Sequence, residues 1–335
     1  MPSWLCPCPV GSLSLMVYLS LVAGTCLLLL GAGVLVDTTV AIARRTRISL
    51  LVLAAVVVGL SSTELYLSLS TALGGRGDMS IGNVLGSNLC NNMLVVGVAA
   101  LICSFRIRND NLRRDIPLSF AATLLVMLLC MDSLFGGDSN GLSRTDGVAL
   151  LLAYAVYVSC IVAWTRRGGA RGQEAGEAQA ATFFTGKPLK LLVPAAMASL
   201  AVLLVGGDMM LDAAVEIAFS LDIPEKVIAI TVMSIGKTLP EIATCSIAAW
   251  KRVPEVALAN VFGENVYNML VILGLAAVVR PIEAHDVDVA DFGMLLLAAA
   301  LTVFFGFISH RRRFGRVEGS VLLIAYFSYI IWLFV

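Results

Sequence analysis

The sequence has 335 residues, of which 59% are hydrophobic and 14% are charged, and its mean hydropathy is +0.92. A soluble domain carries about 25% charged residues, so this composition excludes a water-soluble globular protein. The formal net charge is zero, which gives no reason to expect a nucleic-acid partner.

Apolar runs long enough to cross a hydrocarbon core about 30 Å thick recur along the whole chain. Aromatic residues make up only 7% of the sequence and no segment alternates like a strand ladder, which favours helices over a β-barrel. We therefore expect an all-α polytopic membrane protein of about ten transmembrane helices. The expected helices span residues 13–43, 48–73, 80–104, 115–132, 146–165, 189–218, 226–250, 256–279, 289–308 and 318–335.

A polar segment rich in Gly, Ala, Gln and Glu covers residues 166–188 and separates two halves, 1–165 and 189–335. The first apolar run is too long for a signal-peptide core and lacks a preceding basic region, so we interpret it as a helix. Six of the eight cysteines lie in apolar segments, where cysteine behaves as a small hydrophobic residue. Cys6 and Cys8 leave a metal site open as the less favoured alternative.

Basic residues are distributed very unequally between the two sides of the expected bundle. Eighteen lie in alternate loops: Arg44, Arg45, Arg47, Arg106, Arg108, Arg113, Arg114, Arg166, Arg167, Arg171, Lys187, Lys190, Lys251, Arg252, Arg311, Arg312, Arg313 and Arg316. The opposite loops hold four: Arg76, Arg144, Lys226 and Arg280. This bias predicts a cell membrane protein, in the inner or plasma membrane, with a cytoplasmic 166–188 linker and both termini outside. The alternation requires an even number of helices, which supports ten.

Two segments of the chain resemble each other. GNVLGSNLCNNMLVVG at 82–97 aligns with ANVFGENVYNMLVILG at 259–274, and the same shift of 177 residues aligns GLSSTE at 59–64 with GKTLPE at 236–241. A shorter match joins 31–43 to 206–218. Each half has five expected helices, an odd number, so the second copy must enter the membrane in the opposite orientation. Inverted repeats of this kind are typical of secondary transporters, which bind substrate between the repeats.

Glu64 and Glu241 occupy matching positions near the centres of two expected helices. A lone carboxylate at the bilayer centre is costly, so an intramembrane Glu indicates a function by default. Two such residues repel each other unless a cation or protons lie between them. The alternative is a buried pair with a purely structural role.

The residues around these carboxylates are hard-oxygen donors: Ser61, Ser62, Thr63, Ser87, Asn88, Asn91, Thr238, Glu264, Asn265 and Asn268. Calcium takes six to eight such oxygens, and the absence of a His–Cys cluster in the sequence argues against zinc or copper. Pro240 cannot donate to the carbonyl of Gly236, which indicates a broken helix there. For Ser87, Asn91 and Asn268 the alternative role is hydrogen bonding between helices.

These motifs resemble the α-repeats of the sodium/calcium exchanger family, within the calcium/cation antiporter superfamily. The resemblance covers both repeats, about 56–100 and 233–277, and the flanking helices. It implies a secondary antiporter that exchanges calcium for sodium by alternating access, with calcium between Glu64 and Glu241. Carried over residue by residue, it implies that the ion-binding side chains are Ser61, Glu64, Ser87, Asn91, Thr238, Glu241 and Asn268.

The sequence departs from the family pattern at a few positions. Lys237 stands where a Thr is expected, Glu264 where a Ser is expected, and Thr63 where a Pro is usual. We expect Lys237 and Glu264 to pair, with the ammonium filling the space of a sodium ion. Protons would then share or replace sodium as the counter-ion. The alternative is a structural salt bridge in a carrier that has lost normal transport.

Two other classes remain open. A channel would conduct the cation without a counter-ion, and an intramembrane enzyme would need a nucleophile–base pair or a metal, neither of which the sequence shows. We therefore expect no enzyme activity and no cofactor, and the partners are inorganic cations and membrane lipid. The remaining acidic residues of the long helices are expected to lie in interfacial water: Asp37, Asp208, Asp212 and Glu216. The oligomeric state is not given by the sequence.

Overall fold

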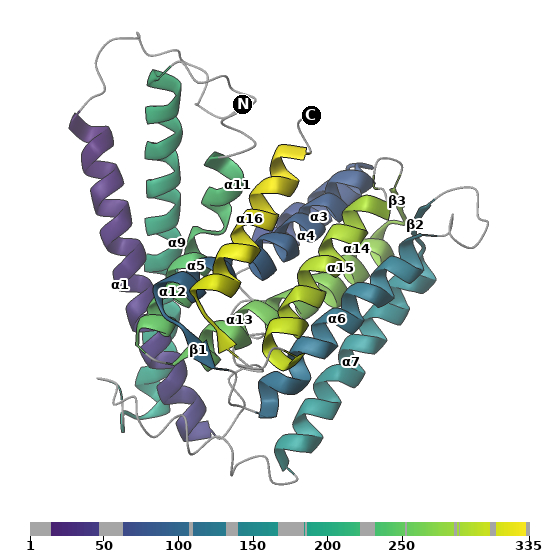
Figure 1. Ribbon diagram of the computed structural model, residues 1–335, viewed down its shortest axis with the longest axis horizontal. Coiled ribbons are helices and arrows are strands. Elements are labelled where there is room, and N and C mark those ends of the chain that lie inside the picture. Colours follow the sequence, from purple (N-terminus) through teal and green to yellow (C-terminus); the bar gives the residue numbers. More distant parts are fainter. Residues whose placement is uncertain are drawn as a thin grey trace.

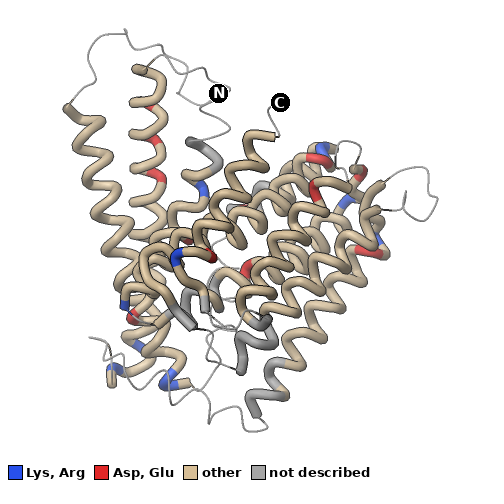
Figure 2. The backbone as a smooth tube through the Cα atoms, in the orientation of Figure 1, with Lys and Arg blue, Asp and Glu red and all other residues tan. Residues whose placement is uncertain are grey.

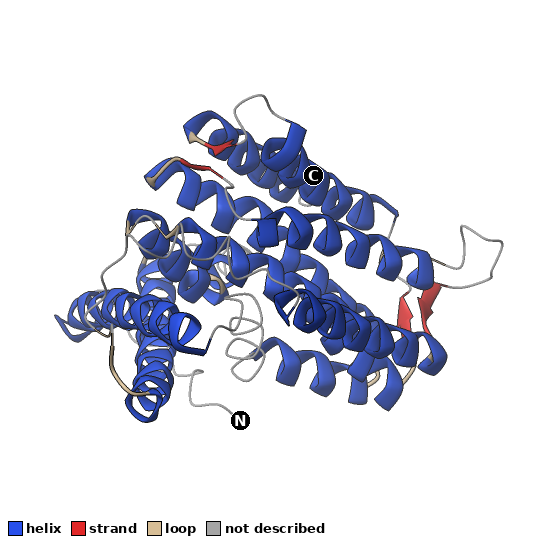
Figure 3. Ribbon diagram, turned by 90° about the horizontal axis from the view of Figure 1, so that it is seen from below, coloured by secondary structure: helices blue, strands red, loops and turns tan. Residues whose placement is uncertain are grey.

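The computed structural model describes residues 15–46, 63–106, 110–131, 140–166, 184, 186–221, 232–251, 253–284, 287, 289–308 and 313–332. Nearly all of these residues are helical, and the strands are confined to two short pairs (Figure 3). In the described part of the chain, five helices are long and apolar enough to cross a membrane: Leu15–Thr46, Gly77–Ile102, Leu189–Ser220, Val261–Val279 and Val289–Gly306. Figure 2 shows that charged residues are sparse along the helices. The chain is thus an all-α polytopic membrane protein.

The elements follow the expected order (Figure 1). In the first half they are α1 (Leu15–Thr46), α3 (Thr63–Leu73), α4 (Gly77–Cys90), η1 (Asn91–Val95), α5 (Val96–Ile102), β1 (Phe105–Arg106), α6 (Asp110–Cys130), β2 (Asn140–Leu142) and α7 (Arg144–Arg166). In the second half they are α9 (Leu189–Ser220), α11 (Val232–Lys237), α12 (Leu239–Trp250), α13 (Pro254–Tyr267), η3 (Asn268–Ile272), α14 (Leu273–Val279), β3 (Ile282–Ala284), α15 (Val289–Val303), η4 (Phe304–Ile308), β4 (Arg313–Phe314) and α16 (Arg316–Trp332).

Within the described residues four of the expected helices are interrupted, and three of these interruptions lie in the repeated segments, the fourth being η4 in the expected helix 289–308. The expected helix 226–250 breaks at Thr238, which separates α11 from α12 and has a non-helical ψ of 6°. The expected helix 80–104 contains the π-helical turn η1, and η3 is its counterpart in the second half. Single π-helical turns within α-helices are frequent at functional sites. The first part of the expected helix 48–73 lies outside the described residues.

Helices α1 and α9 pack along each other at one side of the molecule (Figure 1). Glycines let their backbones meet: a Cβ added to Gly31 would lie 2.6 Å from the backbone nitrogen of Leu203, and one added to Gly206 would collide with that of Leu28. The two helices form an apolar cluster of their own with α12. Their outer surfaces expose large apolar side chains such as Leu30, as a lipid-facing helix pair requires.

The larger apolar core surrounds α4 and α13, with α6, α7, α14, α15 and α16 packed around them (Figure 1). Its largest fully buried side chains include Met93, Phe262, Phe292 and Phe314. This core holds η1 and η3 against their neighbours, and therefore fixes the position of the polar side chains that they carry.

Contacts in this core recur in matched pairs. Gly97 of α5 lies against Gly319 and Leu323 of α16, and Gly274 of α14 lies against Gly147 and Leu151 of α7 in the same way. The strand pairs match too: β1 pairs antiparallel with β4, and β2 pairs antiparallel with β3. Each strand pair joins two loops that the count of basic residues assigns to the same side of the membrane.

Candidate functional site

The two carboxylates singled out in the sequence come from different halves of the chain and lie near each other. Glu64 is on α3 and Glu241 is in the first turn of α12, and the two groups interact electrostatically. Ser87 Oγ of α4 donates a hydrogen bond to Glu64 Oε1 at 3.3 Å. Glu241 Oε2 is buried and has no hydrogen-bond partner. Both carboxylates therefore face the interior of the bundle.

The break at Thr238 places Glu241 where the backbone favours a negative charge. The new helix α12 starts at Leu239, with Pro240 and Glu241 in its first turn, and unsatisfied N–H groups at a helix start attract anions. The buried Thr238 hydroxyl donates to the carbonyl of Ile235 at 2.9 Å and accepts a bond from Cys90 Sγ at 3.4 Å. The Thr238 hydroxyl is therefore buried and bonded within the protein at the break between α11 and α12.

Asparagines from α4, η1, α13 and η3 connect the two halves of the chain. Asn265 is at the centre of the network: its backbone carbonyl accepts from Asn88 Nδ2 at 3.1 Å, and its side-chain oxygen accepts from Asn91 Nδ2 at 3.2 Å. Asn265 Nδ2 donates to Asn92 Oδ1 at 3.0 Å, and Asn268 Nδ2 donates to Asn88 Oδ1 at 3.2 Å. The side-chain oxygens of Asn88, Asn92 and Asn265 are thus used within the protein.

Two asparagine oxygens are not used in this way. Asn91 Oδ1 and Asn268 Oδ1 are buried without a hydrogen-bond partner, as is Glu241 Oε2. Buried polar atoms are costly without a partner, and carboxylate and amide oxygens are the ligands that hard cations prefer. Three or more His, Cys, Asp or Glu side chains do not converge on a metal position within the described residues. The arrangement fits a cation bound by a few carboxylate, amide and hydroxyl oxygens.

Glu264 adds a third carboxylate. It lies on α13, only 3% exposed, accepts a hydrogen bond from Asn91, and interacts electrostatically with Glu64 and Glu241. Lys237 instead is exposed on α11 and acts electrostatically on Glu64. The expected Lys237–Glu264 ion pair is not present in the described part of the chain: Lys237 is exposed, whereas Glu264 is enclosed on α13.

The structure therefore brings together Glu64, Glu241, Ser87, Asn91, Asn268, Thr238 and Glu264, whereas Ser61 lies outside the described residues. The sequence did not single out Cys90, Asn92 or Tyr326. Cys90 Sγ lies 3.6 Å from Tyr326 Oη as well as bonding to Thr238. Cys90 and Asn92 could have been identified only from their positions on either side of Asn91 in the motif. Tyr326 has no such signal in the sequence.

The chain is similar to a known protein family and to several of its members. The sodium/calcium exchanger protein family matches residues 16–163 and 192–335. The inner membrane protein YrbG of Escherichia coli is 31% identical over 280 residues, which are 82% of each chain. The sodium/calcium exchanger MaX1 of Methanosarcina acetivorans is 26% identical over 348 residues, covering 95% of this chain and 98% of that protein.

Among solved structures, the sodium-calcium exchanger NCX_Mj without sodium and calcium superposes with a TM-score of 0.77 at 25% identity. The match covers 96% of this chain and 100% of NCX_Mj. The fold and the buried oxygen-rich cluster define a membrane cation transporter of the exchanger type. The chain belongs to the sodium/calcium exchanger family.

Proposed function

We propose that this chain exchanges calcium for sodium across the membrane by alternating access, with the ion held between Glu64 and Glu241. The observation that carries the proposal is the pair of mutually interacting carboxylates from the two halves, beside buried acceptor oxygens that no protein donor satisfies. A cation between the carboxylates removes their repulsion and coordinates these oxygens. Such a carrier needs no covalent chemistry, so we propose neither an enzyme activity nor a cofactor.

We infer further that the protein is built from two inverted repeats of five helices, 1–165 and 189–335, joined by the cytoplasmic linker 166–188. The matched glycine contacts of α5 with α16 and of α14 with α7 support this plan, as do the two strand pairs. The repeated segments 56–100 and 233–277 would supply the ion ligands. Ser61 belongs to this proposed set through its motif.

Calcium uptake into proteoliposomes loaded with sodium tests the proposal. Neutralising either carboxylate, by Glu64→Gln or Glu241→Gln, removes a charged ligand worth about 3 kcal/mol, so calcium affinity should fall about a hundredfold. Glu283→Gln, at the exposed middle residue of strand β3, is the matched control and should leave uptake unchanged. Uptake by Glu241→Gln at the wild-type rate and affinity would rule the proposed ion site out.

A proton-coupled calcium antiporter is the second candidate, and Glu264 favours it. A third buried carboxylate beside Glu64 and Glu241 gives the site more negative charge than one calcium ion balances. Protons that travel in the opposite direction would remove the excess. Uptake driven by a proton gradient alone, without sodium, would select this candidate. Uptake that needs neither counter-ion gradient would instead indicate a channel.

A further inference from the structure

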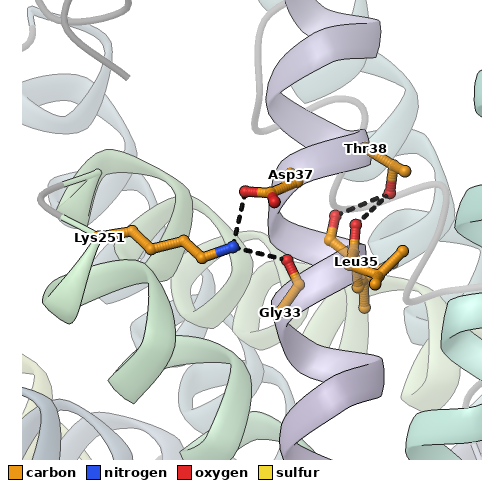
Figure 4. A network of polar contacts seen from close by, with 6 residues as sticks. Gly33, Leu35, Asp37, Thr38 and Lys251 are labelled. Atoms are coloured by element: carbon orange, nitrogen blue, oxygen red, sulfur yellow. Dashed lines mark hydrogen bonds and ion pairs between the residues drawn. The ribbon is translucent and has the colours of Figure 1, made fainter. Parts of the chain in front are cut away.

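An ion pair ties the α1–α9 pair to the rest of the bundle (Figure 4). Lys251 Nζ, directly after the end of α12, lies 2.7 Å from Asp37 Oδ1 and donates a second bond to the carbonyl of Gly33 at 2.9 Å. Gly33 and Asp37 are four residues apart, one turn of α1. Side-chain exposures of 29% for Lys251 and 20% for Asp37 show that both are largely screened from solvent. Asp37, which the sequence analysis expected in interfacial water, is therefore partly buried and paired.

The ion pair joins α1 to α12, a helix that packs in both apolar clusters. Helices α1 and α9 share the small apolar cluster, and the part of α1 around Asp37 also contacts the large core of the ion-site helices α4 and α13 through Val36, Val40 and Ala43. In the described part of the chain α1 packs mainly against α9, and meets the large core through α12 and, less extensively, α13. A displacement of α1 relative to the end of α12 would therefore break the contacts of Lys251.

Among the described residues, the second half shows no equivalent ion pair. The repeat shift of 175 residues relates Asp37 to Asp212 on α9, and the shift of 177 residues relates Lys251 to Gly74. Asp212 is exposed, interacts with Asp208, and has no ion pair among the described residues. The ion pair therefore differs between the two halves. It holds α1 at Asp37, whereas Asp212, the corresponding residue of α9, forms no such pair among the described residues.

We propose that Asp37 and Lys251 form a latch that holds α1 against the end of α12 in one state of the transport cycle and opens in the other. This proposal rests on the proposed alternating access. In two symmetric halves the inward-facing and outward-facing states would have similar free energies. A contact present in only one state shifts their populations in its favour. The latch closes the side that carries Lys251, which the basic residues predict to be cytoplasmic.

The test uses the full-length protein, with Asp37→Asn, Lys251→Gln, the double variant and the charge exchange Asp37→Lys with Lys251→Asp. Asp212→Asn is the matched control on α9. The first readout is the ratio of calcium half-saturation concentrations at the two membrane faces, measured in vesicles of opposite orientation. The second is hydrogen–deuterium exchange of the peptides covering 33–46 and 239–251 in purified protein, which needs no transport.

Each single variant should shift the ratio by about fivefold in the same direction, the upper range for a partly exposed ion pair. The double variant should shift it no further, and the charge exchange should restore it. Deuterium uptake should rise in both peptides for the single variants and stay unchanged for Asp212→Asn. Additive single effects, or unchanged ratio and uptake, would overturn the latch. Should wild-type protein transport no calcium while the deuterium pattern holds, the proposed function fails and the latch stands.

Discussion

The role of each buried asparagine depends on which of its atoms is already bonded. Asn91 and Asn92 are neighbours in η1, and each is 1% exposed. Both side chains bond to Asn265, but Asn92 does so through its oxygen and Asn91 through its nitrogen. Only Asn91 therefore keeps an oxygen that a cation could use. Adjacent residues of the same type thus separate into a proposed ligand and a structural connector.

This difference predicts distinct effects for two matched substitutions. Asn91→Ala should lower calcium affinity about tenfold, because a buried ligand oxygen is lost. Asn92→Ala should change affinity less than about threefold but lower the free energy of unfolding by about 1–3 kcal/mol, because Asn265 Nδ2 is left without its acceptor. Calorimetric calcium titration and thermal unfolding in detergent measure both quantities. Equal losses of affinity would show that Asn91 has no special contact with the ion.

At the residue scale, the sequence indicated the two carboxylates and the oxygen donors near them, but not the hydrogen bonds that these side chains make. Glu64 and Glu241 stood out because a charged group within an apolar run needs a partner. The hydrogen bond from Cys90 to Thr238 joins residues 148 positions apart, and local patterns carry no signal for such a contact. The Lys237–Glu264 pairing failed for the same reason: adjacency in a motif alignment does not give the direction of a side chain.

The sequence predicts some of the breaks in the helices but not others. The break at Thr238 was predictable, because Gly236 and Pro240 weaken the helix on both sides of it. The π-helical turns η1 and η3 were not expected, because a π-turn widens the helix by one residue without a characteristic composition. Yet η1 and η3 carry Asn91 and Asn268, so the unpredicted feature orients two of the proposed ligands.

Close contact between α1 and α9 predicts that Gly206→Ala destabilises the protein. The added Cβ would collide with the backbone of Leu28, which cannot move aside as a flexible side chain would. Overpacking of this kind costs about 1–3 kcal/mol. Gly293→Ala on α15 is the control: a Cβ there meets nothing within 4 Å, and alanine favours the helix by up to about 1 kcal/mol. Thermal unfolding should separate the two variants. A Gly206→Ala protein as stable as wild type would show that the helices are not in backbone contact.

At the scale of the whole molecule, hydropathy was sufficient for the approximate helix spans, and the shift of 177 residues anticipated the matched contacts of Gly97 and Gly274. The sequence did not show that α1 and α9 pack along each other and form a small apolar cluster with α12. It also did not show that Lys251 reaches Asp37, 214 residues away. Such contacts depend on how the helices pack against one another. The hydrophobic periodicity of a sequence describes each helix separately and does not give this packing.

Loop pairing leads to a prediction about topology that can be tested on the intact chain. β1 with β4 joins loops that are rich in Arg, whereas β2 with β3 joins loops on the side with few basic residues. Since basic loops stay in the cytoplasm, alkaline phosphatase fused after Val335 should be active and green fluorescent protein fused there should be dark. A protease site inserted after Gly172, in the linker, should be cut only from the cytoplasmic side. Fluorescence at the Val335 fusion together with external cleavage at Gly172 would show that the protein has the opposite orientation in the membrane. Calcium would then leave the latched state toward the cytoplasm, so the same measurement also fixes which direction the Asp37–Lys251 ion pair favours.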